Sequence, residues 1–489
     1  MAHRDVLGQG GPFDAERARH LMLYISVVTI FAFAARALPG PFLPIVMIEQ
    51  FKQRESMVGV ATAAYPMAAL LATPFATSRL MKTKRIMRAH CLALMLMAGS
   101  NAIMSSAAHL LGIVGPRSAT LAIVIFRMLQ GIAFAYYMGA NTTLITRIFP
   151  KDVSYIVALV EVFVGVGAQL GRLFGGVIYD AAGFAAPFLL VAGLQAVTAS
   201  MGFLCFGRCE GSGGTSGELR GTEVAGTCEV PVRWSALLGP RVLLGMFAVF
   251  LNFFQVGFYD TTLSPFLKDH LELEGTTTIS VLFALRSLSY LSFSYFCGQL
   301  MRHRAVSFEV LILCGATCCT TACILIPLNP DDFSIRGQAH VGILLYEAMS
   351  LMIGSAGPAL LFIPSLPIMQ HGVRHLGTAA IEQTTTLFMA MMSIGEAIGP
   401  ILGGWLVQSF GFQVSSAIVL MPFAMQILCS FSVWLTLGGA VDVHEDTDAN
   451  AVQMTDQKGT SRAYHPFIVD DNNSGCETMA NAMDSPSHV

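Results

Sequence analysis

Long apolar stretches alternate with short polar segments along most of this chain. Twelve of the stretches are long enough to cross roughly 30 Å of hydrocarbon as helices. Periodicity within them is weak, as expected of helices that are apolar on most sides. Their approximate limits are 20–38, 57–77, 89–112, 119–148, 153–178, 185–206, 241–266, 277–300, 307–328, 340–368, 377–406 and 412–436. The pattern therefore predicts an all-α membrane protein with twelve transmembrane helices.

The composition leaves little room for a soluble fold. Of the 489 residues, 54% are hydrophobic and 12% are charged, against about 25% charged residues in typical globular chains. Most helical surface must therefore face lipid. The sequence also lacks a glycine-rich phosphate loop, a zinc-protease helix and a catalytic-triad signature. We therefore expect neither an enzyme nor an ATP-driven pump, and neither a cofactor nor a nucleic-acid partner.

A glycine-rich segment occurs twice. GAQLGRLFGGVIYDAAGF at 167–184 recurs 228 residues later as GEAIGPILGGWLVQSFGF at 395–412. The alignment pairs Gly171 with Gly399, Arg172 with Pro400, Gly175 with Gly403, and Gly176 with Gly404. Each copy lies in the fifth predicted span of its half, and small residues at such spacing favour close helix packing. The repeat predicts two pseudo-symmetric six-helix bundles, the organisation of many secondary transporters.

The segments outside the spans complete the predicted domain organisation. The predicted order is an N-tail at 1–19, one bundle at 20–207, a linker at 208–239, a second bundle at 240–437 and a tail at 438–489. The linker contains GSGGTSGELRG, a composition typical of flexible chain. The tail is acidic and poor in large apolar residues, so we expect it to be disordered.

Lysine and arginine are distributed unevenly between alternate loops. If both termini are cytoplasmic, the cytoplasmic segments hold 19 of these residues and the opposite side holds 5. Cytoplasmic loops of membrane proteins carry such an excess. We therefore expect both termini, the linker and the tail in the cytoplasm.

The cysteines indicate neither a disulfide framework nor a metal site. Four of the eleven share one span, with no histidine or carboxylate beside them; these are Cys314, Cys318, Cys319 and Cys323. We interpret them as small packing residues.

Two motifs resemble those of the major facilitator superfamily. RMLQG at 127–131 matches the R-x-x-Q-G motif of that superfamily, and the second repeat copy, GPILGG at 399–404, matches its G-P-x-x-G-G antiporter motif. FYDTTLSPF at 258–266, IPSLP at 363–367 and SIGEAIGPILGG at 393–404 narrow the resemblance to the vesicular amine transporter family, in its polyamine-linked branch. The resemblance implies a vesicular or other endomembrane carrier that exchanges protons for an organic cation.

Nine charged side chains fall well inside the predicted spans. Each costs roughly 2.5–3.5 kcal/mol at a helix centre unless it faces a cavity or a partner. The acidic ones are Glu161, Asp260, Glu347, Glu382 and Glu396, and the basic ones are Arg36, Arg127, Arg172 and Arg286. Because the two sets nearly balance, some of these residues must form structural ion pairs.

Four of these residues are candidates for substrate binding or proton coupling. The resemblance implies that Asp260 stands where the family has a functional carboxylate. It also implies that Glu161 corresponds to an acidic residue of the polyamine-linked branch. For Arg127 it implies a role in proton coupling. Glu382 shares a face of its span with Ser393. For the carboxylates the alternatives are a half-solvated position at a helix end or an ion pair with a neighbouring helix.

The other charged residues are candidates for substrate selection or for pairing between the bundles. Arg172 stands where the antiporter motif has proline, and Arg36 lies in a span that lacks the aspartate of monoamine and acetylcholine carriers. Arg286 and Glu396 are likewise candidates either for substrate selection or for pairing between the bundles. Uncharged polar residues of the spans are candidates for lining a central cavity; these are Gln130, Asn141, Asn252, Gln255 and Ser393.

The sequence therefore predicts a twelve-helix carrier of small organic solutes that works by alternating access, as a monomer, with protons as a second partner. The four arginines in the spans leave open a carrier of organic anions or zwitterions. A receptor built on a carrier fold is a further alternative.

Overall fold

The structure is a computed structural model that describes residues 12–83, 85–148, 153–207, 234–303, 306–328 and 339–456. Within these ranges the chain is helical, with turns and no strand. The N-terminal half comprises α1 (Pro12–Ala37), α2 (Leu43–Glu49), α3 (Glu55–Met81), α4 (Ile86–Ser105), α5 (Ala107–Ile148), α6 (Val153–Ala182), α7 (Ala185–Gly202) and η1 (Phe203–Gly207). The C-terminal half comprises α8 (Trp234–Leu237), α9 (Pro240–His270), α10 (Thr277–Arg302), α11 (Phe308–Leu325), α12 (Ala339–Gly354), α13 (Ala356–Val373), η4 (Arg374–Leu376) and α14 (Thr378–Asp456).

The all-α membrane fold is confirmed. The described residues contain 11 helical segments long and apolar enough to cross a membrane. One of them, Ala379–Thr436, has 58 residues, far more than the about 20 that one crossing takes. It is broken at Gly411, whose φ of 76° and ψ of 167° are not helical. Divided there, it supplies two crossings and brings the count to the predicted twelve.

Glycines with positive φ end the helix of each repeat copy. Gly183, between α6 and α7, has φ 80°, and Gly411 has φ 76°. These two positions are equivalent in the repeat. Because L side chains rarely adopt this conformation, glycine there allows a sharp reversal into the next helix.

One predicted span differs in detail. The stretch 340–368 is divided into α12 and α13, which meet at Ser355. Pro358 lies at the third position of α13. Since proline has no N–H to donate to the preceding turn, the helical hydrogen-bond ladder is interrupted at this point.

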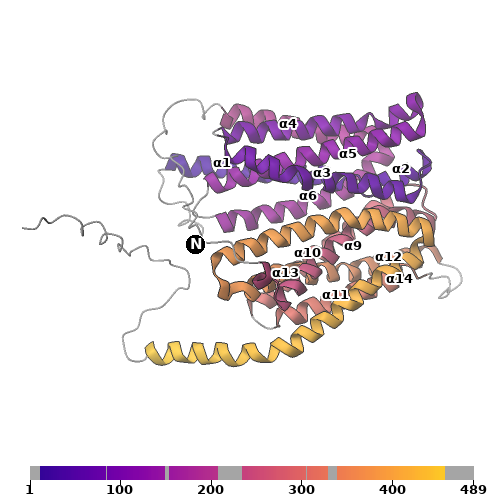
Figure 1. Ribbon diagram of the computed structural model, residues 1–489. Helices are drawn as coiled ribbons and strands as arrows, with labels where there is room; N and C mark the ends of the chain where they lie inside the picture. The colour runs from indigo at the N-terminus through magenta and orange to yellow at the C-terminus, as the bar shows by residue number, and fades with distance from the viewer. Residues whose placement is uncertain are drawn as a thin grey trace, which may run out of the picture. The chain divides into compact units, whose positions relative to one another are not determined.

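Each half has its own hydrophobic core. In the N-terminal half one cluster surrounds Tyr137 and a second surrounds Phe42. In the C-terminal half a single cluster surrounds Phe258 and Phe283, with Ile45 of α2 also packed into it. Figure 1 shows the corresponding two groups of helices side by side. The predicted two-bundle arrangement therefore corresponds to two separately packed cores.

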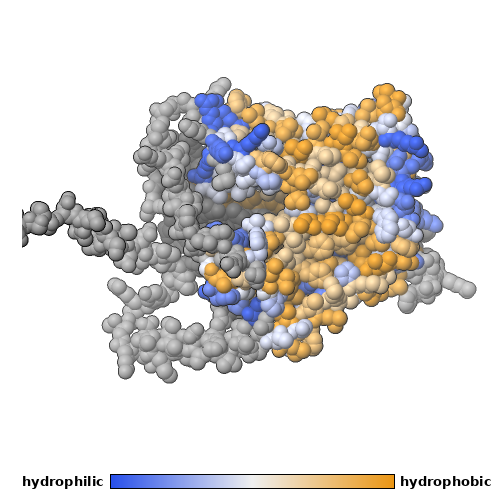
Figure 2. Space-filling view, in the orientation of Figure 1, coloured by the Kyte–Doolittle hydropathy of each residue, from blue (hydrophilic) through white to orange (hydrophobic). Residues whose placement is uncertain are grey.

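The outer surface carries a broad apolar belt. Figure 2 shows hydrophobic residues across the middle of the visible face, with hydrophilic residues gathered toward its two ends. Ile113, Phe75 and Leu428 are 77%, 68% and 70% exposed. A soluble protein rarely exposes so much contiguous apolar surface, so this belt is the lipid-facing surface of an integral multi-pass membrane protein.

The C-terminal unit, Thr436–Val489, separates from the rest of the chain two residues before the predicted tail. Its described part differs from the expected disorder, because α14 continues to Asp456. Extending an existing helix avoids the cost of nucleation, so polar residues can continue the helical conformation. Residues 457–489, and residues 208–233 of the predicted linker, lie outside the described ranges.

We distinguish two ends of the two-bundle body. The linker end is where η1 finishes and α8 begins. The distal end carries α2, the turn between α9 and α10, and Gly411. The helices run alternately between these ends, so that α1, α6 and α9 arrive at the distal end while α3 and α10 start there.

Candidate functional site

The first and second repeat copies pack their glycines against equivalent helices. Gly171 of α6 lies against Ala34 of α1, where an added Cβ would come 2.8 Å from the Ala34 Cα atom. Gly399 of α14 lies against Phe254 of α9, where an added Cβ would come 3.1 Å from the Phe254 carbonyl carbon. Both distances are shorter than nine in ten of the contacts that Cβ atoms make in known structures, so a larger residue would not fit at either position without a shift. The glycines therefore allow backbone contact within each bundle, as predicted for small residues at this spacing.

The second glycine of each GG pair faces the opposite bundle. An added Cβ on Gly176 would lie 2.8 Å from the Thr276 carbonyl oxygen of α10, and one on Gly404 would lie 3.1 Å from the Cα of Gly59 on α3. The first glycine of each pair, Gly175 or Gly403, faces α1 or α9 of its own bundle. The repeat therefore controls packing within each bundle and contact between the bundles.

The polar residue four positions after each GG pair binds the start of a helix in the other bundle. Asp180 Oδ1 accepts hydrogen bonds from Thr276 N and Oγ1 at 3.0 and 2.9 Å, and its Oδ2 accepts two from Thr277 N and Oγ1, both at 2.7 Å. At the equivalent position Gln408 accepts one bond from the backbone N–H of Ser56, at 3.3 Å. The N–H groups of a first helical turn have no partner within their own helix. Asp180 supplies that cap to α10, and Gln408 supplies it to α3.

Five of the predicted charged residues meet between the bundles in what we call the central charge cluster. Its members are Arg36 of α1, Arg172 of α6, Asp260 of α9, Arg286 of α10 and Glu396 of α14. They come from five different helices of both bundles. All of them are only partly buried, so none is fully enclosed by the packed cores of the bundles.

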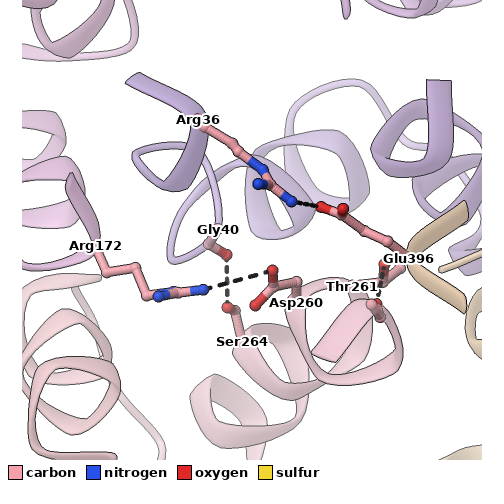
Figure 3. Close-up of polar contacts among 8 residues, drawn as sticks. Arg36, Gly40, Arg172, Asp260, Thr261, Ser264 and Glu396 are labelled. Atoms are coloured by element: carbon pink, nitrogen blue, oxygen red, sulfur yellow. Dashed lines mark hydrogen bonds and ion pairs between the residues drawn. The ribbon is translucent and has the colours of Figure 1, made fainter. Parts of the chain in front are cut away.

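The closest contact in the cluster joins α1 to α14. Arg36 donates a hydrogen bond from a terminal nitrogen to Glu396 Oε1, and both side chains are partly exposed, 26% and 19%. The Arg36 guanidinium also lies 5.5 Å from the centre of the Phe134 ring, where a cation–π attraction supports it. Figure 3 shows this pair bridging the two bundles. Of the two alternatives for Arg36 and Glu396, pairing between bundles is the geometry present.

Asp260 is held more loosely. Its Oδ2 lies 3.9 Å from the nearest Arg172 nitrogen, and its side chain is 27% exposed. Its Oδ1 has no hydrogen-bond partner. Figure 3 shows the Arg172 side chain extending toward Asp260 from the opposite bundle. Arg286, over the Tyr259 ring at 5.0 Å, is attracted to the same carboxylate. Asp260 therefore has two cations nearby but an oxygen left to accept a hydrogen bond from a ligand.

Arg127 lies inside the N-terminal bundle. It is 5% exposed, stacks over the Tyr65 ring at 4.8 Å and donates to Gln130 at 3.1 Å. Gln130 in turn donates to Asn101 at 2.8 Å, and Asn101 donates to Gln195 at 2.9 Å. This chain of hydrogen bonds runs across α5, α4 and α7. It satisfies polar groups that would otherwise be costly to bury.

The predicted cavity-lining amides occupy interior positions in this conformation. Gln130 and Asn141 are 4% and 3% exposed in the N-terminal bundle, and Asn252 and Gln255 are 3% and 0% exposed in the C-terminal bundle. Gln255 accepts a contact from the Cys319 thiol at 3.1 Å. These side chains are enclosed by neighbouring helices, and Asn141 Oδ1, Asn252 Oδ1 and Gln255 Nε2 have no hydrogen-bond partner among the described residues.

The remaining candidates lie toward the linker end or outside the described side chains. Glu382 is exposed near the start of α14, and Ser393, partly buried, donates to the Met389 carbonyl at 3.0 Å. Glu161 lies on α6, but its side chain is outside the described part of the chain. Among the described residues, no group of three or more His, Cys, Asp or Glu is placed to hold a metal ion.

Sequence reasoning missed the residues that cap helices and those that extend the amide network. Asp180 and Gln408 occupy equivalent places in the repeat, and both are polar, which was the available signal. Asn101 and Gln195 are uncharged residues in apolar spans, and no periodic pattern marks them. Their pairing depends on which faces of α4, α5 and α7 come together.

Two helix bundles in the membrane, joined through a cluster of charged side chains, are the organisation of many secondary transporters. The sequence profile described as Major Facilitator Superfamily matches residues 25–381. The chain belongs to this superfamily, whose members are transporters and not enzymes.

Known relatives are similar at low identity. The MFS-type transporter SLC18B1 of Homo sapiens is 25% identical over 299 residues, which is 60% of each chain. The vesicular acetylcholine transporter unc-17 of Caenorhabditis elegans is 21% identical over 335 residues, 66% of this chain and 59% of that protein. The resemblance to vesicular amine transporters is confirmed, and the alignments span about three fifths of each relative.

Solved structures share the fold. A bacterial homologue of the human lysosomal transporter Spinster, crystallised in an inward-facing, unoccupied conformation, superposes with a TM-score of 0.62 at 14% identity, over 86% of this chain and 97% of that one. The nucleoside transporter NupG gives a TM-score of 0.56 at 13% identity, over 84% of this chain and 98% of that one. At this identity the likeness establishes the fold alone.

Proposed function

We propose that this protein is a proton-coupled antiporter of an organic cation, such as a polyamine or another amine. The observation that carries the proposal is Asp260, a carboxylate between the bundles that is 27% exposed, 3.9 Å from its nearest cation, and has an unpartnered oxygen. An ammonium group can bind such a carboxylate without first breaking a tight ion pair. The acetylcholine named for unc-17 is itself an organic cation, which supports this substrate class.

The interactions between the bundles suggest how binding would be coupled to movement. An ammonium at Asp260 competes with Arg172, and releasing Arg172 weakens a contact that joins α6 to α9. Other contacts between the bundles, at Asp180 and Gln408, gather at the distal end. With both termini cytoplasmic, as the charge distribution predicts, this end faces the vesicle lumen or the lumen of another endomembrane compartment, and the carrier is closed on that side.

A carrier of organic anions or zwitterions is the second candidate. The described charges near the centre comprise four guanidinium groups, those of Arg36, Arg127, Arg172 and Arg286, against the two carboxylates of Asp260 and Glu396. An anionic group would be attracted by this excess. The two candidates differ in which solute competes, so one assay separates them.

The test is uptake into proteoliposomes with an imposed pH gradient. We expect spermidine uptake that depends on the gradient and is inhibited by other amines. Asp260→Asn should reduce uptake at least about tenfold, because a neutral amide loses charge-assisted binding of a cation. Glu274→Gln, an exposed residue in the turn before α10, is the matched control and should transport normally.

Three results would contradict the proposal. Inhibition by organic anions and not by amines identifies the second candidate. Normal amine uptake by Asp260→Asn removes the carboxylate from the mechanism. Saturable amine binding without flux in either direction identifies a receptor on a carrier fold.

A further inference from the structure

A histidine and a glutamate that the central charge cluster does not include lie together near the distal end of the C-terminal bundle. His270 is the last residue of α9, and Glu347 lies near the middle of α12. His270 Nε2 is 3.5 Å from Glu347 Oε1. The Glu347 side chain is 0% exposed, and neither of its oxygens has a hydrogen-bond partner. From the sequence alone, Glu347 is a charged residue inside a predicted span with no further assignment.

This environment requires the pair to hold a proton. An ionised carboxylate that is fully buried and lacks hydrogen bonds is strongly disfavoured unless a cation lies beside it. Glu347 is therefore either protonated itself or paired with a protonated His270. In both arrangements the pair carries one proton and no net charge. A second proton would make the pair positive, and loss of the first would make it negative.

One member of the pair reaches a cavity. His270 lines a distal cavity of about 440 Å³ between the two bundles, together with Glu55, Val58, Phe266, Asp269 and Phe412. The imidazole stacks on the Phe266 ring with centroids 5.1 Å apart, and that ring stacks on Phe412 at 4.0 Å. The stack fixes the imidazole at the cavity wall, with Glu347 behind it and away from water.

The charges around His270 favour its protonated form. Asp269 lies beside it on α9, and Glu55 of α3 lies on the same cavity wall. The nearby cation, Lys268, is paired with Glu49 of α2 at 2.5 Å. The residues that α14 contributes to the cavity are Val407, Gly411 and Phe412, which carry no charge.

The titratable groups on the helices around Glu347 are engaged elsewhere. Helices α10, α11 and α13 pack on α12. Arg286 of α10 lies over Tyr259, and Cys319 and Cys323 of α11 contact residues of α9. His371 of α13 lies in the last turn of that helix, toward the linker end. Tyr346, next to Glu347, donates to the Leu325 carbonyl at 2.6 Å.

We propose that His270 and Glu347 form a proton-binding site that is loaded from the distal cavity. Asp260 and His270 lie on the same helix, ten residues apart, which is about 15 Å along the axis. A single rigid element therefore carries the substrate carboxylate at one place and the proton site at another. A second proton places a positive charge inside an apolar bundle, which is energetically unfavourable. Entry of water lowers this energy. Acid on the distal side therefore favours opening of that side. This last step, coupling to transport, rests on the proposed antiport function.

The proton site is tested by infrared spectroscopy of the purified full-length protein between about pH 9 and about pH 5. We expect a protonated-carboxyl band that grows as the pH falls and that is absent in Glu347→Gln. In His270→Gln the same band should persist to higher pH, because Glu347 loses the cation that pairs with it. Glu274→Gln is the control for an exposed carboxyl, and it should leave the band unchanged.

The site is refuted if Glu347→Gln leaves every carboxyl band of the wild type in place, or if His270→Gln titrates as the wild type does. The His270 variant keeps the test decisive should Glu347→Gln fail to fold. Transport separates this proposal from the preceding one. A titrating Glu347 band without amine uptake retains the proton site and rejects the antiporter. Amine uptake by Glu347→Gln with the pH dependence of the wild type rejects the coupling role and retains the antiporter.

Discussion

The two copies of the glycine repeat have the same geometry but make contacts of different chemistry. In both copies one glycine faces its own bundle, a later glycine faces the other bundle, and a polar residue caps a helix across the interface. The first copy makes its cross-bundle contacts with charge, through Arg172 and Asp180. The second copy also contributes Glu396 to the ion pair with Arg36, but from Pro400 onward it meets the other bundle by close packing, through Pro400 against Gly59, and by the single cap from Gln408.

This difference assigns separate roles to the two interfaces. The α3–α14 interface is a backbone-to-backbone contact, whose strength depends on shape. The α6–α10 interface also has a close contact at Gly176, but the hydrogen bonds of Asp180 and the Arg172–Asp260 pair are polar, and a cationic substrate or water can compete for them. We infer that the charged contacts of the first copy change during transport and that the second copy, from Pro400 to Gln408, provides a tightly packed seal.

The largest effect is expected for a side chain at the second copy's interface. In Gly404→Val the new Cβ collides with the Glu55 and Gly59 backbones, which cannot rotate away. Overpacking of this kind costs about 1–3 kcal/mol or more, so the distal end should no longer close and transport should be lost. Spin labels at Arg117 and Glu274, both exposed at the distal end, would report a longer distance between the bundles.

Two further glycine variants serve as comparison and control for Gly404→Val. Gly176→Val should have a smaller effect, because its nearest neighbour is the Ser280 side chain, which can move. Its one backbone neighbour, the Thr276 carbonyl oxygen at 2.8 Å, is less close than the Glu55 carbonyl oxygen is to Gly404. Gly193→Val, at an exposed helical position with nothing within 4 Å, should leave the distance unchanged. Equal losses at Gly176 and Gly404 would remove the distinction between the two interfaces.

The second largest effect is expected for Asp180→Ala. The change removes four hydrogen bonds to Thr276 and Thr277 and leaves the start of α10 without its cap. A lost cap costs about 1 kcal/mol, with an upper value of about 2, so the open population should rise by about fivefold or more, up to about thirtyfold, in the same distance measurement. An unchanged distance distribution would show that the Asp180 hydrogen bonds do not hold the distal end closed.

A smaller effect is expected for Arg172→Gln. The pair with Asp260 is long, at 3.9 Å, and partly exposed, and such pairs contribute about 1 kcal/mol or less. The open population should rise no more than about fivefold, while spermidine should bind more tightly because its competitor for Asp260 is gone. Arg172→Lys keeps the charge and should restore wild-type affinity. Weaker amine binding in Arg172→Gln would indicate that Arg172 contacts substrate directly.

The smallest effect is expected for Gln408→Ala. It removes one hydrogen bond, at 3.3 Å, from an exposed position, and surface changes of this kind stay within about 0.5 kcal/mol. Distance distribution and uptake should both match the wild type. A loss as large as that of Asp180→Ala would show that the two caps are equivalent, against the proposed division of roles.

Much of the fold could be read from the sequence, because membrane insertion and helix packing depend on local composition and spacing. The twelve spans required only length and apolarity. The repeat in turn identified Gly171 and Gly399 as packing positions, since no other residue lets two backbones approach so closely. The helical continuation of α14 to Asp456 was missed because residues 438–456 are polar, and polarity predicts exposure to water and not the absence of a helix.

The candidate site was predicted as a set of residues but not as an arrangement. The sequence identified Arg36, Arg172, Asp260 and Glu396 through the cost of charge within a span. It could not pair them, because Arg36 and Glu396 are 360 positions apart, and their contact depends on how two separately packed bundles face each other. The same holds for His270 and Glu347, which meet only because α9 and α12 bring them within 3.5 Å.

The sequence by itself therefore determined that this protein spans the membrane twelve times, in two related halves with glycines where helices pack closely. The spans follow from the free energy of placing each segment in lipid, and the close packing follows from the spacing of small residues. Tertiary structure alone decided which charges pair, which amides are buried, and which carboxylate keeps a free oxygen between the bundles. The physical reason is that these contacts are set by the rotation of each helix about its axis and by the conformation in which the bundles meet, and neither is encoded in the composition of a single span.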